Sequence, residues 1–290
     1  MNSDFTIGSG IFDAIRNQID AGDTGIAQAL ELARIGHAVA VRILPHTEFG
    51  EIGIDEEDAV LLTDAFPNGL ADAVQAALVL AHIPGVESQH HLRRIALYSR
   101  LMAQAVAADN GLDEEFVDCV YRFAPLHDIG MAAIPRSLLR KPGRLDPAEL
   151  ARIKQHAELG ALVMEHIAAQ AGAASPMALR VMRNIVLSHH ERGDGSGYPQ
   201  GLVMAQTPLE ARIVAVADVY DALSTSRPYR DVLPQEAIEQ ELLGEAHRGR
   251  LDAACVTALL AAQAQCREIQ RRFPDTDRVP QIGWNQVRQS

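Results

Sequence analysis

Two adjacent histidines and a glycine-rich loop stand together in the stretch HHERGDGSGYP, residues 189–199. Imidazole is the commonest protein ligand for a transition metal, and a helix that ends in two histidines presents a pair of them. The glycines allow backbone conformations that other residues avoid, and they let the backbone approach a bulky ligand closely. His127-Asp128 lies upstream and Asp218 lies downstream, so this segment of the chain carries the pieces of a multinuclear metal site.

Helical patterns dominate the sequence from about residue 87 onward. Apolar residues recur with a helical period between Glu87 and Ala108. Asp113 is placed to cap a helix that leads into His127-Asp128, and Ser175-Pro176 begins a helix that leads to His189-His190. No run of alternating strands interrupts this region, so we expect an all-α bundle.

Three further helices are predicted from their starting signals. Residues 146–149 place an aspartate at the N-cap, proline next and glutamate third, and the helix that follows is expected to carry His156. Residues 207–210 form a capping-box pattern with proline at the first helical position, ahead of a helix with Asp218. A final helix spans roughly residues 252–271.

The first 85 residues are less regular than the rest. They contain helix-like stretches and one strand-like run at residues 38–44, and Pro84-Gly85 disfavours a continuous helix at their end. We therefore expect a mainly α protein with two parts. A small N-terminal domain of α or α/β class, residues 1–85, has a regulatory or dimerising role, and residues 86–290 form the all-α helical bundle.

Composition and charge exclude several classes of protein. The net charge of -12 over 290 residues argues against a general nucleic-acid coat, which needs a basic face. The longest apolar stretches fall short of the ~20 residues of a membrane helix, and the N-terminus lacks a signal-peptide pattern. The three cysteines have unrelated spacings and are interpreted as reduced thiols. The chain is expected to be cytoplasmic and to bind neither nucleic acid nor a membrane.

Each candidate ligand is weak evidence when it is taken alone. A His-Asp pair often makes ordinary capping contacts, and His189 and His190 point about 100 degrees apart on a helix. Two ions remove this second difficulty, because each imidazole can serve a different ion of a close pair. Glu87 and His91 are four residues apart and could chelate together from one helix face, or they could be a surface pair.

Two other candidates have competing explanations. Asp218 follows the apolar run at residues 213–217, where an unpaired carboxylate would be costly to bury. A metal ion would remove this cost, and so would a buried salt bridge. His156 by itself is equally compatible with a helix surface.

Taken together, these motifs resemble the HD-GYP subgroup of the HD-domain metal-dependent phosphohydrolases, bacterial enzymes that degrade cyclic di-GMP. The resemblance covers about residues 87–252, and the last motif within it is rich in arginine. The matching motifs are HLR (91–93), LHDIG (126–130), IKQH (153–156), HHERGDGSGYP (189–199), VADVYDAL (216–223) and RPYR (227–230). The fold that this resemblance implies is an HD-domain helical bundle.

The resemblance also implies roles for individual residues. The implied metal ligands are Glu87, His91, His127, Asp128, His156, His189, His190 and Asp218. His127 and Asp128 would be the catalytic pair, and Tyr198, Arg227 and Arg230 would bind substrate. Two or three transition-metal ions are implied, and the third depends on Glu87. A ligand set of oxygen and imidazole suits iron or manganese.

The implied reaction is hydrolysis of cyclic di-GMP to pGpG, with GMP as an optional further product, by a metal-bridging hydroxide. Met131 stands where the family usually has a lysine that touches a substrate phosphate. The site therefore lacks the positive charge of that lysine, and the alternative is that Met131 simply fills an apolar gap.

Two alternatives to this activity stay open. The chain could be a metal-containing cyclic di-GMP receptor or protein-interaction module with little activity, or a phosphodiesterase for a related cyclic dinucleotide. Partners through the Gly-Tyr-Pro loop, of the diguanylate-cyclase type or other signalling proteins, are left open, and so is a homodimer.

Overall fold

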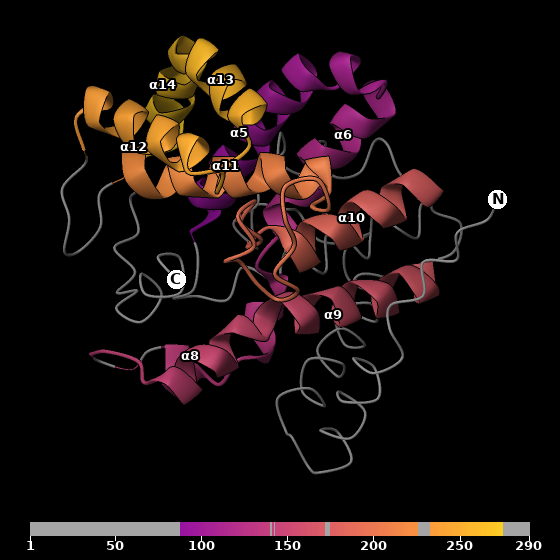
Figure 1. Ribbon diagram of the computed structural model, residues 1–290. Coiled ribbons are helices and arrows are strands. Elements are labelled where there is room, and N and C mark those ends of the chain that lie inside the picture. Colours follow the sequence, from indigo (N-terminus) through magenta and orange to yellow (C-terminus); the bar gives the residue numbers. More distant parts are fainter. Residues whose placement is uncertain (1–87, 140, 142, 172–174, 226–232, 275–290) are drawn as a thin grey trace.

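The computed structural model describes residues 88–139, 141, 143–171, 175–225 and 233–274 (Figure 1). Within these residues the chain is helical, and its only extended pairing is an isolated bridge between Asp194 and Val203. The α-helices are α5 (Gln89–Val106), α6 (Glu114–Phe123), α7 (Arg136–Leu139), α8 (Pro147–Lys154), α9 (His156–Ala171), α10 (Pro176–Ser188), α11 (Leu209–Ser224), α12 (Gln235–His247), α13 (Ala253–Ala261) and α14 (Gln263–Arg272). The 3-10 helices are η3 (Ala108–Asn110), η4 (Ala124–Leu126) and η5 (Ile129–Ala133). The all-α class is confirmed, and the expected N-terminal domain, residues 1–85, lies outside the described residues.

Side chains at the helix starts explain why several helices begin where they do. Ser88, Asp113 and Ser175 each accept a hydrogen bond from the backbone N–H three residues further on. Asp146 and Glu149 form a complete capping box at the start of α8. These contacts satisfy backbone donors that have no partner inside a helix, and the helix starts predicted at Asp113, Asp146 and Ser175 are confirmed.

The capping box predicted for α11 is wrong. The N-cap position is Pro208, and no side chain caps the helix. The hydroxyl of Thr207 instead donates to the carbonyl of Val203, and the carboxylate of Glu210 accepts a hydrogen bond of 2.8 Å from Asn184. A local carbonyl therefore takes up the hydroxyl of Thr207 and a tertiary partner takes up the carboxylate of Glu210, the two side chains that the sequence pattern assigned to the cap.

Two other predicted helices are each divided in the structure. The last helix breaks at Ala262, which has φ −95° and ψ 19°, into α13 and α14. The helix capped by Asp146 ends at Lys154, and His156 is the first residue of α9 rather than part of α8. This second break turns the chain so that His156 faces the interior, where it is fully buried.

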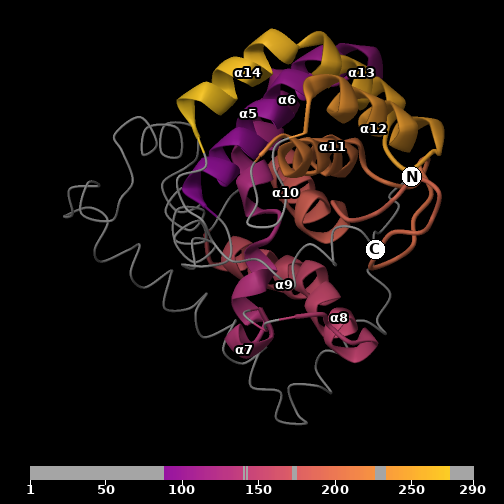
Figure 2. The ribbon, with the colours of Figure 1, turned by 90° about the vertical axis from the view of Figure 1, so that its left-hand side faces the viewer.

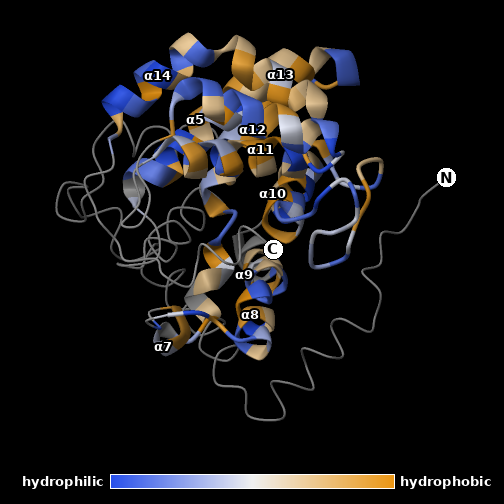
Figure 3. Cartoon of the chain, turned by 60° about the vertical axis from the view of Figure 1, so that its left-hand side comes forward, coloured by the Kyte–Doolittle hydropathy of each residue, from blue (hydrophilic) through white to orange (hydrophobic). Residues whose placement is uncertain are grey.

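The helices stack in a definite order. α10 and α11 lie between α12–α14 on one side and α8–α9 on the other, as both views of the ribbon show (Figures 1 and 2). α5 packs against α6, α11 and α13, while α10 packs against α6, α9 and α11. Hydrophobic and hydrophilic residues alternate along these helices, and the apolar residues form the core between them (Figure 3). No helix among the described residues is long and apolar enough to cross a membrane.

A glycine contact brings η5 against the start of α9. A Cβ atom at Gly130 would lie only 1.9 Å from the carbonyl oxygen of His156 and 2.6 Å from the backbone nitrogen of Gly160. No side chain fits at such distances, so the two backbones can approach this closely only with glycine at position 130. The contact places Asp128, two residues earlier, next to His156.

Candidate metal centre

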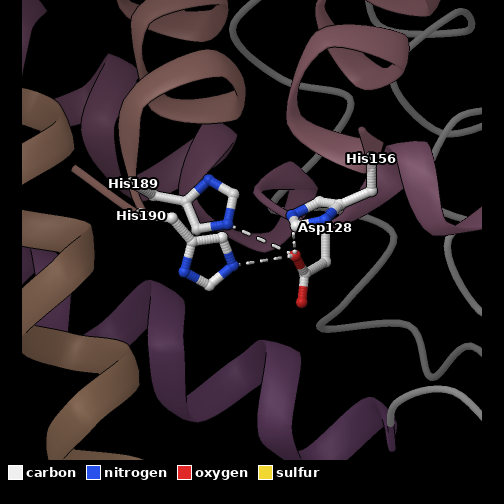
Figure 4. A group of neighbouring side chains, drawn as sticks. All are labelled: Asp128, His156, His189 and His190. Atoms are coloured by element: carbon white, nitrogen blue, oxygen red, sulfur yellow. Dashed lines mark ion pairs between the residues drawn. The ribbon is translucent and has the colours of Figure 1, made fainter. Parts of the chain in front are cut away.

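Four buried side chains meet at the end of α10, and we call them the four-ligand group (Figure 4). They are Asp128, His156, His189 and His190. One nitrogen or oxygen from each lies within 4.8 Å of the others. Oδ1 of Asp128 is 3.1 Å from Nε2 of His156, 3.3 Å from Nε2 of His189 and 4.0 Å from Nε2 of His190.

The members of this group stand at or next to the ends of helices. α10 ends at Ser188, so His189 is its C-cap residue and His190 follows directly. The predicted helix end at the histidine pair is therefore confirmed. Asp128 lies at the junction of η4 and η5, and His156 opens α9. Side chains at helix ends can converge from different directions, which residues within one helix cannot do.

A second cluster, which we call the three-ligand group, consists of His91, His127 and Asp218. All three are buried, and their candidate ligand atoms also lie within 4.8 Å of one another. His91 comes from the first turn of α5 and Asp218 from the middle of α11. His127 follows η4. Residues that are far apart in the sequence thus form one site because α5 packs against α11 and η4.

Asp128 stands between the two groups. Its Oδ1 faces the histidines of the four-ligand group, while its Oδ2 is 3.4 Å from Nε2 of His127 in the three-ligand group. The ring centroids of His127 and His189, one residue from each group, are 5.1 Å apart. This is the arrangement needed for one carboxylate to bridge two close ions.

Backbone carbonyls set the orientation of three of the imidazoles. Nδ1 of His127 lies 3.0 Å from the carbonyl oxygen of Ala124, and Nδ1 of His156 lies 2.9 Å from the carbonyl oxygen of Ile153. Nδ1 of His189 is 3.0 Å from the carbonyl oxygen of Ile185. A carbonyl oxygen only accepts, so each Nδ1 carries the donated proton and Nε2 is the atom directed into the site.

His189 shows that a cation fits this donor set. Burial lowers its pKa, so the ring is neutral and its lone pair is on Nε2. Burial by itself raises the pKa of Asp128, but the charge and hydrogen bonding of the surrounding histidines, His127 first, hold it well below its usual range. Nε2 of His189 and Nε2 of His190 are buried and have no hydrogen-bond partner among the described residues, and Oδ1 of Asp128 lies 3.3 Å from the first of them. Neutral imidazole with carboxylate is the ligand form that metals require.

His190 belongs to the same electrostatic environment. Burial lowers its pKa well below the usual value, and the neighbouring His189 and His156 lower it further. Its ring stacks on Tyr198 with centroids 4.7 Å apart. Tyr198, the residue predicted to contact substrate, is buried against a member of the four-ligand group.

The loop that carries Tyr198 is held by Glu191. The buried carboxylate of Glu191 accepts hydrogen bonds of 2.7 Å from the backbone of Gln200 and 2.9 Å from that of Leu202. The backbone N–H of Tyr198 also donates to the carbonyl of His190 at 3.2 Å. These three bonds close the loop back onto the histidine pair.

A cation also lies close to the tyrosine. Nζ of Lys154 is 4.8 Å from the centroid of the Tyr198 ring, and burial lowers the pKa of this lysine. A partly desolvated ammonium near this tyrosine favours an anionic ligand. Met131, by contrast, is buried in the hydrophobic core, which supports its interpretation as a packing residue.

The sequence assigned no role to Asp221, which contacts a predicted ligand, or to Arg94, which contacts Asp221. Asp221 accepts from Nδ1 of His91 at 2.7 Å, and Arg94 pairs with Asp221 at 2.6 Å. Burial raises the pKa of Asp221, but Arg94 and then His91 outweigh burial and keep it below its usual range. Their spacing could have identified them, because Asp221 is three residues after Asp218 on α11 and Arg94 is three after His91 on α5.

Three of the predicted site residues cannot be placed. Glu87, Arg227 and Arg230 lie outside the described residues. The remaining predicted ligands are all brought together, in the two groups above.

Comparison with known proteins agrees with this fold and site. Residues 77–255 match the family described as the HD domain. A probable cyclic di-GMP phosphodiesterase of Vibrio cholerae is 35% identical over 226 residues, which cover 76% of this chain and 51% of the relative. The cyclic di-GMP phosphodiesterase response regulator RpfG of Xanthomonas campestris is 43% identical over 182 residues, which cover 62% of this chain and 46% of the relative. A 3'3'-cGAMP-specific phosphodiesterase of Vibrio cholerae is 36% identical over 207 residues, which cover 71% of this chain and 36% of the relative.

The described residues form a helical bundle in which histidines and aspartates from several helices meet at one buried centre, and the matching family model is that of the HD domain. The chain belongs to the HD-domain family and, within it, to the HD-GYP subgroup. It spans about half the length of the curated relatives that it matches.

Proposed function

We propose that this chain hydrolyses a phosphodiester bond of a cyclic dinucleotide, with cyclic di-GMP as the first substrate candidate. The position of Asp128 carries the proposal. One buried carboxylate lies between two groups of imidazole and carboxylate ligands, with a different oxygen facing each group. Two ions held close together on one carboxylate are typical of centres that cleave phosphoester bonds.

The ligand set that we propose has one ion at each group and Asp128 shared between them. When bound, the ions would supply positive charge for the phosphoryl oxygens and lower the pKa of a water molecule. Nitrogen and oxygen ligands without thiolate favour iron or manganese. A third ion is part of the proposal if Glu87 contributes its carboxylate.

The protein itself contributes rigidity and local charge. The hydrogen bonds from Nδ1 to backbone carbonyls hold Nε2 of His127, His156 and His189 toward the centre, so no reorientation is needed when a ligand arrives. The Tyr198 ring covers His190 and shields it from water. Lys154 adds a positive charge where a dinucleotide phosphate would approach. We propose that Tyr198, with Arg227 and Arg230, contacts the substrate.

The names of the relatives support a cyclic dinucleotide as substrate. Two of the relatives above are named for cyclic di-GMP, and one is named for 3'3'-cGAMP at nearly the same identity. This makes 3'3'-cGAMP the second substrate candidate. The two molecules share the cyclic phosphodiester ring and differ in one base, so the same hydrolytic site would serve either.

Hydrolysis assays on the metal-loaded chain test this function. Protein loaded anaerobically with Mn²⁺ or Fe²⁺ is incubated with cyclic di-GMP and, separately, with 3'3'-cGAMP, and the products are separated by chromatography. We expect one water to add across a P–O ester bond and give linear pGpG from the first. Asp128→Ala should reduce the rate by more than about 100-fold. Even the substitution of a residue that only hydrogen-bonds to a metal ligand typically lowers metal affinity or activity about 10–100-fold.

Each other outcome identifies a different function. Binding of cyclic di-GMP by the metal-loaded chain without any product would mean that the domain is a receptor. Faster turnover of 3'3'-cGAMP would assign the second substrate. Equal rates for the wild type and Asp128→Ala would refute a reaction at this centre.

A further inference from the structure

The buried network behind His91 differs from the contacts of the other anchored histidines. Nδ1 of His91 donates to Oδ2 of Asp221 at 2.7 Å, so a carboxylate occupies the place that backbone carbonyls take behind His127, His156 and His189. A carboxylate carries a full negative charge, whereas a carbonyl has only a partial one. The hydrogen bond therefore makes Nε2 of His91 a stronger electron donor than a carbonyl would.

Arg94 fixes the Asp221 carboxylate in place. Its Nε donates to Oδ1 at 2.6 Å and its Nη2 to Oδ2 at 2.9 Å, which is a two-point contact in the plane of the carboxylate. A third guanidinium nitrogen, Nη1, donates to the carbonyl of Phe273 at 2.8 Å, directly after α14. Arg94 and Asp221 are each 1% exposed. With three anchored contacts, this arginine leaves the carboxylate a single orientation toward His91.

We propose that Asp221, held by Arg94, is a positioning residue that sets the affinity of the three-ligand group for its metal ion without setting that of the four-ligand group. The inference rests on the proposed metal function of both groups. Its basis is the geometry, because Asp221 accepts a hydrogen bond from His91, which belongs to the three-ligand group. Asp218, a member of the same group, precedes Asp221 by one turn of α11.

A purely structural role is the competing explanation. The same residues join α5 to α11 and to the segment after α14, so their loss would also weaken the fold. Stability alone cannot separate the two roles. Selective loss of one ion can, because a general loosening of the bundle would affect both groups.

Titration of Mn²⁺ into the metal-stripped full-length chain provides the test. Asp221→Asn keeps the shape of the side chain and a hydrogen-bond acceptor for His91 but removes the charge. We expect the wild type to bind two ions, or three if Glu87 takes part, and to show the electron paramagnetic resonance spectrum of an exchange-coupled pair. The variant should bind one of these ions about 10–100-fold more weakly. At low Mn²⁺ its spectrum should be that of an isolated ion.

Asp252→Asn is the matched control. Asp252 is also buried and paired with an arginine, Arg212, and asparagine preserves its role as the N-cap of α13. Its side chain contacts Arg212 and the backbone of Ala254 and Cys255, which belong to neither ligand group. We expect this variant to bind Mn²⁺ as the wild type does, whatever change occurs in its melting temperature.

Arg94→Lys provides a second variant in case Asp221→Asn does not fold. Lysine keeps the positive charge but loses the two-point contact, so the affinity for the same ion should fall by a smaller factor. The coupled spectrum should return at high Mn²⁺ in both variants.

Three outcomes decide the inference. Unchanged Mn²⁺ affinities in both variants, with a coupled wild-type spectrum, would overturn the role of Asp221 and leave the metal centre intact. Equal weakening of all ions would also overturn it, in favour of the structural role. A wild type that binds no Mn²⁺ would instead refute the proposed metal function itself.

Discussion

Glu191 holds the loop after the histidine pair through two backbone amides, those of Gln200 and Leu202. The side chain is buried, and its two oxygens each accept one hydrogen bond. Gly197 packs against the same turn, since a Cβ atom there would lie 2.2 Å from the backbone nitrogen of Arg192. At the scale of a single residue, one carboxylate thus determines that Tyr198 lies on the His190 ring.

Glu191→Gln should disturb this loop and leave the metal ligands in place. An amide has one accepting oxygen, so one of the two backbone donors loses its partner, at a cost of roughly 1–3 kcal/mol. We expect a higher KM for the cyclic dinucleotide and a lower melting temperature, with metal content unchanged. Glu210→Gln is the control, because Glu210 is also buried and accepts from Asn184 away from the loop. Loss of metal from Glu191→Gln would show that the glutamate acts on the ligands directly.

The contact between η5 and α9 is the decisive packing event at the scale of the helices. It requires that the backbone of Gly130 lie against the His156 carbonyl, and this contact joins Asp128 to the histidines. The close approach also explains why α8 and α9 are separate, because the break at Gln155 brings the first turn of α9 against η5.

Gly130→Ala should therefore separate Asp128 from His156. The added methyl group would overlap backbone atoms that have no room to move, and overpacking typically costs about 1–3 kcal/mol or more. We expect a melting temperature lower by about 2–4 °C for each kcal/mol, together with weaker Mn²⁺ binding. Gly244→Ala on α12 is the control, since its Cβ would meet only the flexible end of Arg248 at 3.3 Å. A Gly130→Ala variant with wild-type stability and Mn²⁺ affinity would mean that the two elements can separate without consequence.

The candidate metal centre joins most of the molecule. Its ligands come from α5, α9, α11, the end of α10 and the junction of η4 with η5. Ions bound there would connect α9, on one side of the stack in Figure 1, with α5, α10 and α11. Because the unfolded chain does not hold these ligands together, metal binding should stabilise the folded state.

Removal of metal by a chelator should lower the melting temperature of the whole domain. At a free metal concentration 100 times Kd, binding adds about 2.7 kcal/mol, which corresponds to roughly 5–11 °C for a domain of this size. Differential scanning calorimetry with and without chelator measures the shift. Asp128→Ala should show a much smaller shift, and an equal shift in both proteins would place the stabilising ion elsewhere.

The sequence by itself determined the helical class, the helix starts at Asp113, Asp146 and Ser175, and the identity of the candidate ligands. These are local properties: a cap depends on side chains within one turn, and an imidazole or carboxylate is a potential ligand wherever it stands. The helix end at His189 belongs with them. The predicted capping box at Thr207 and Glu210 failed because Thr207 bonds the carbonyl of Val203 in the preceding turn and Glu210 bonds the distant Asn184.

Only the tertiary structure decided how the ligands divide into two groups and which residues stand behind them. His91 and Asp221 are separated by 130 positions, and their contact exists because α5 packs on α11. The shared position of Asp128 depends on the backbone approach at Gly130, which involves residues from η5 and α9. Distances of this kind arise from the packing of whole helices, and no pattern within one stretch of sequence encodes them.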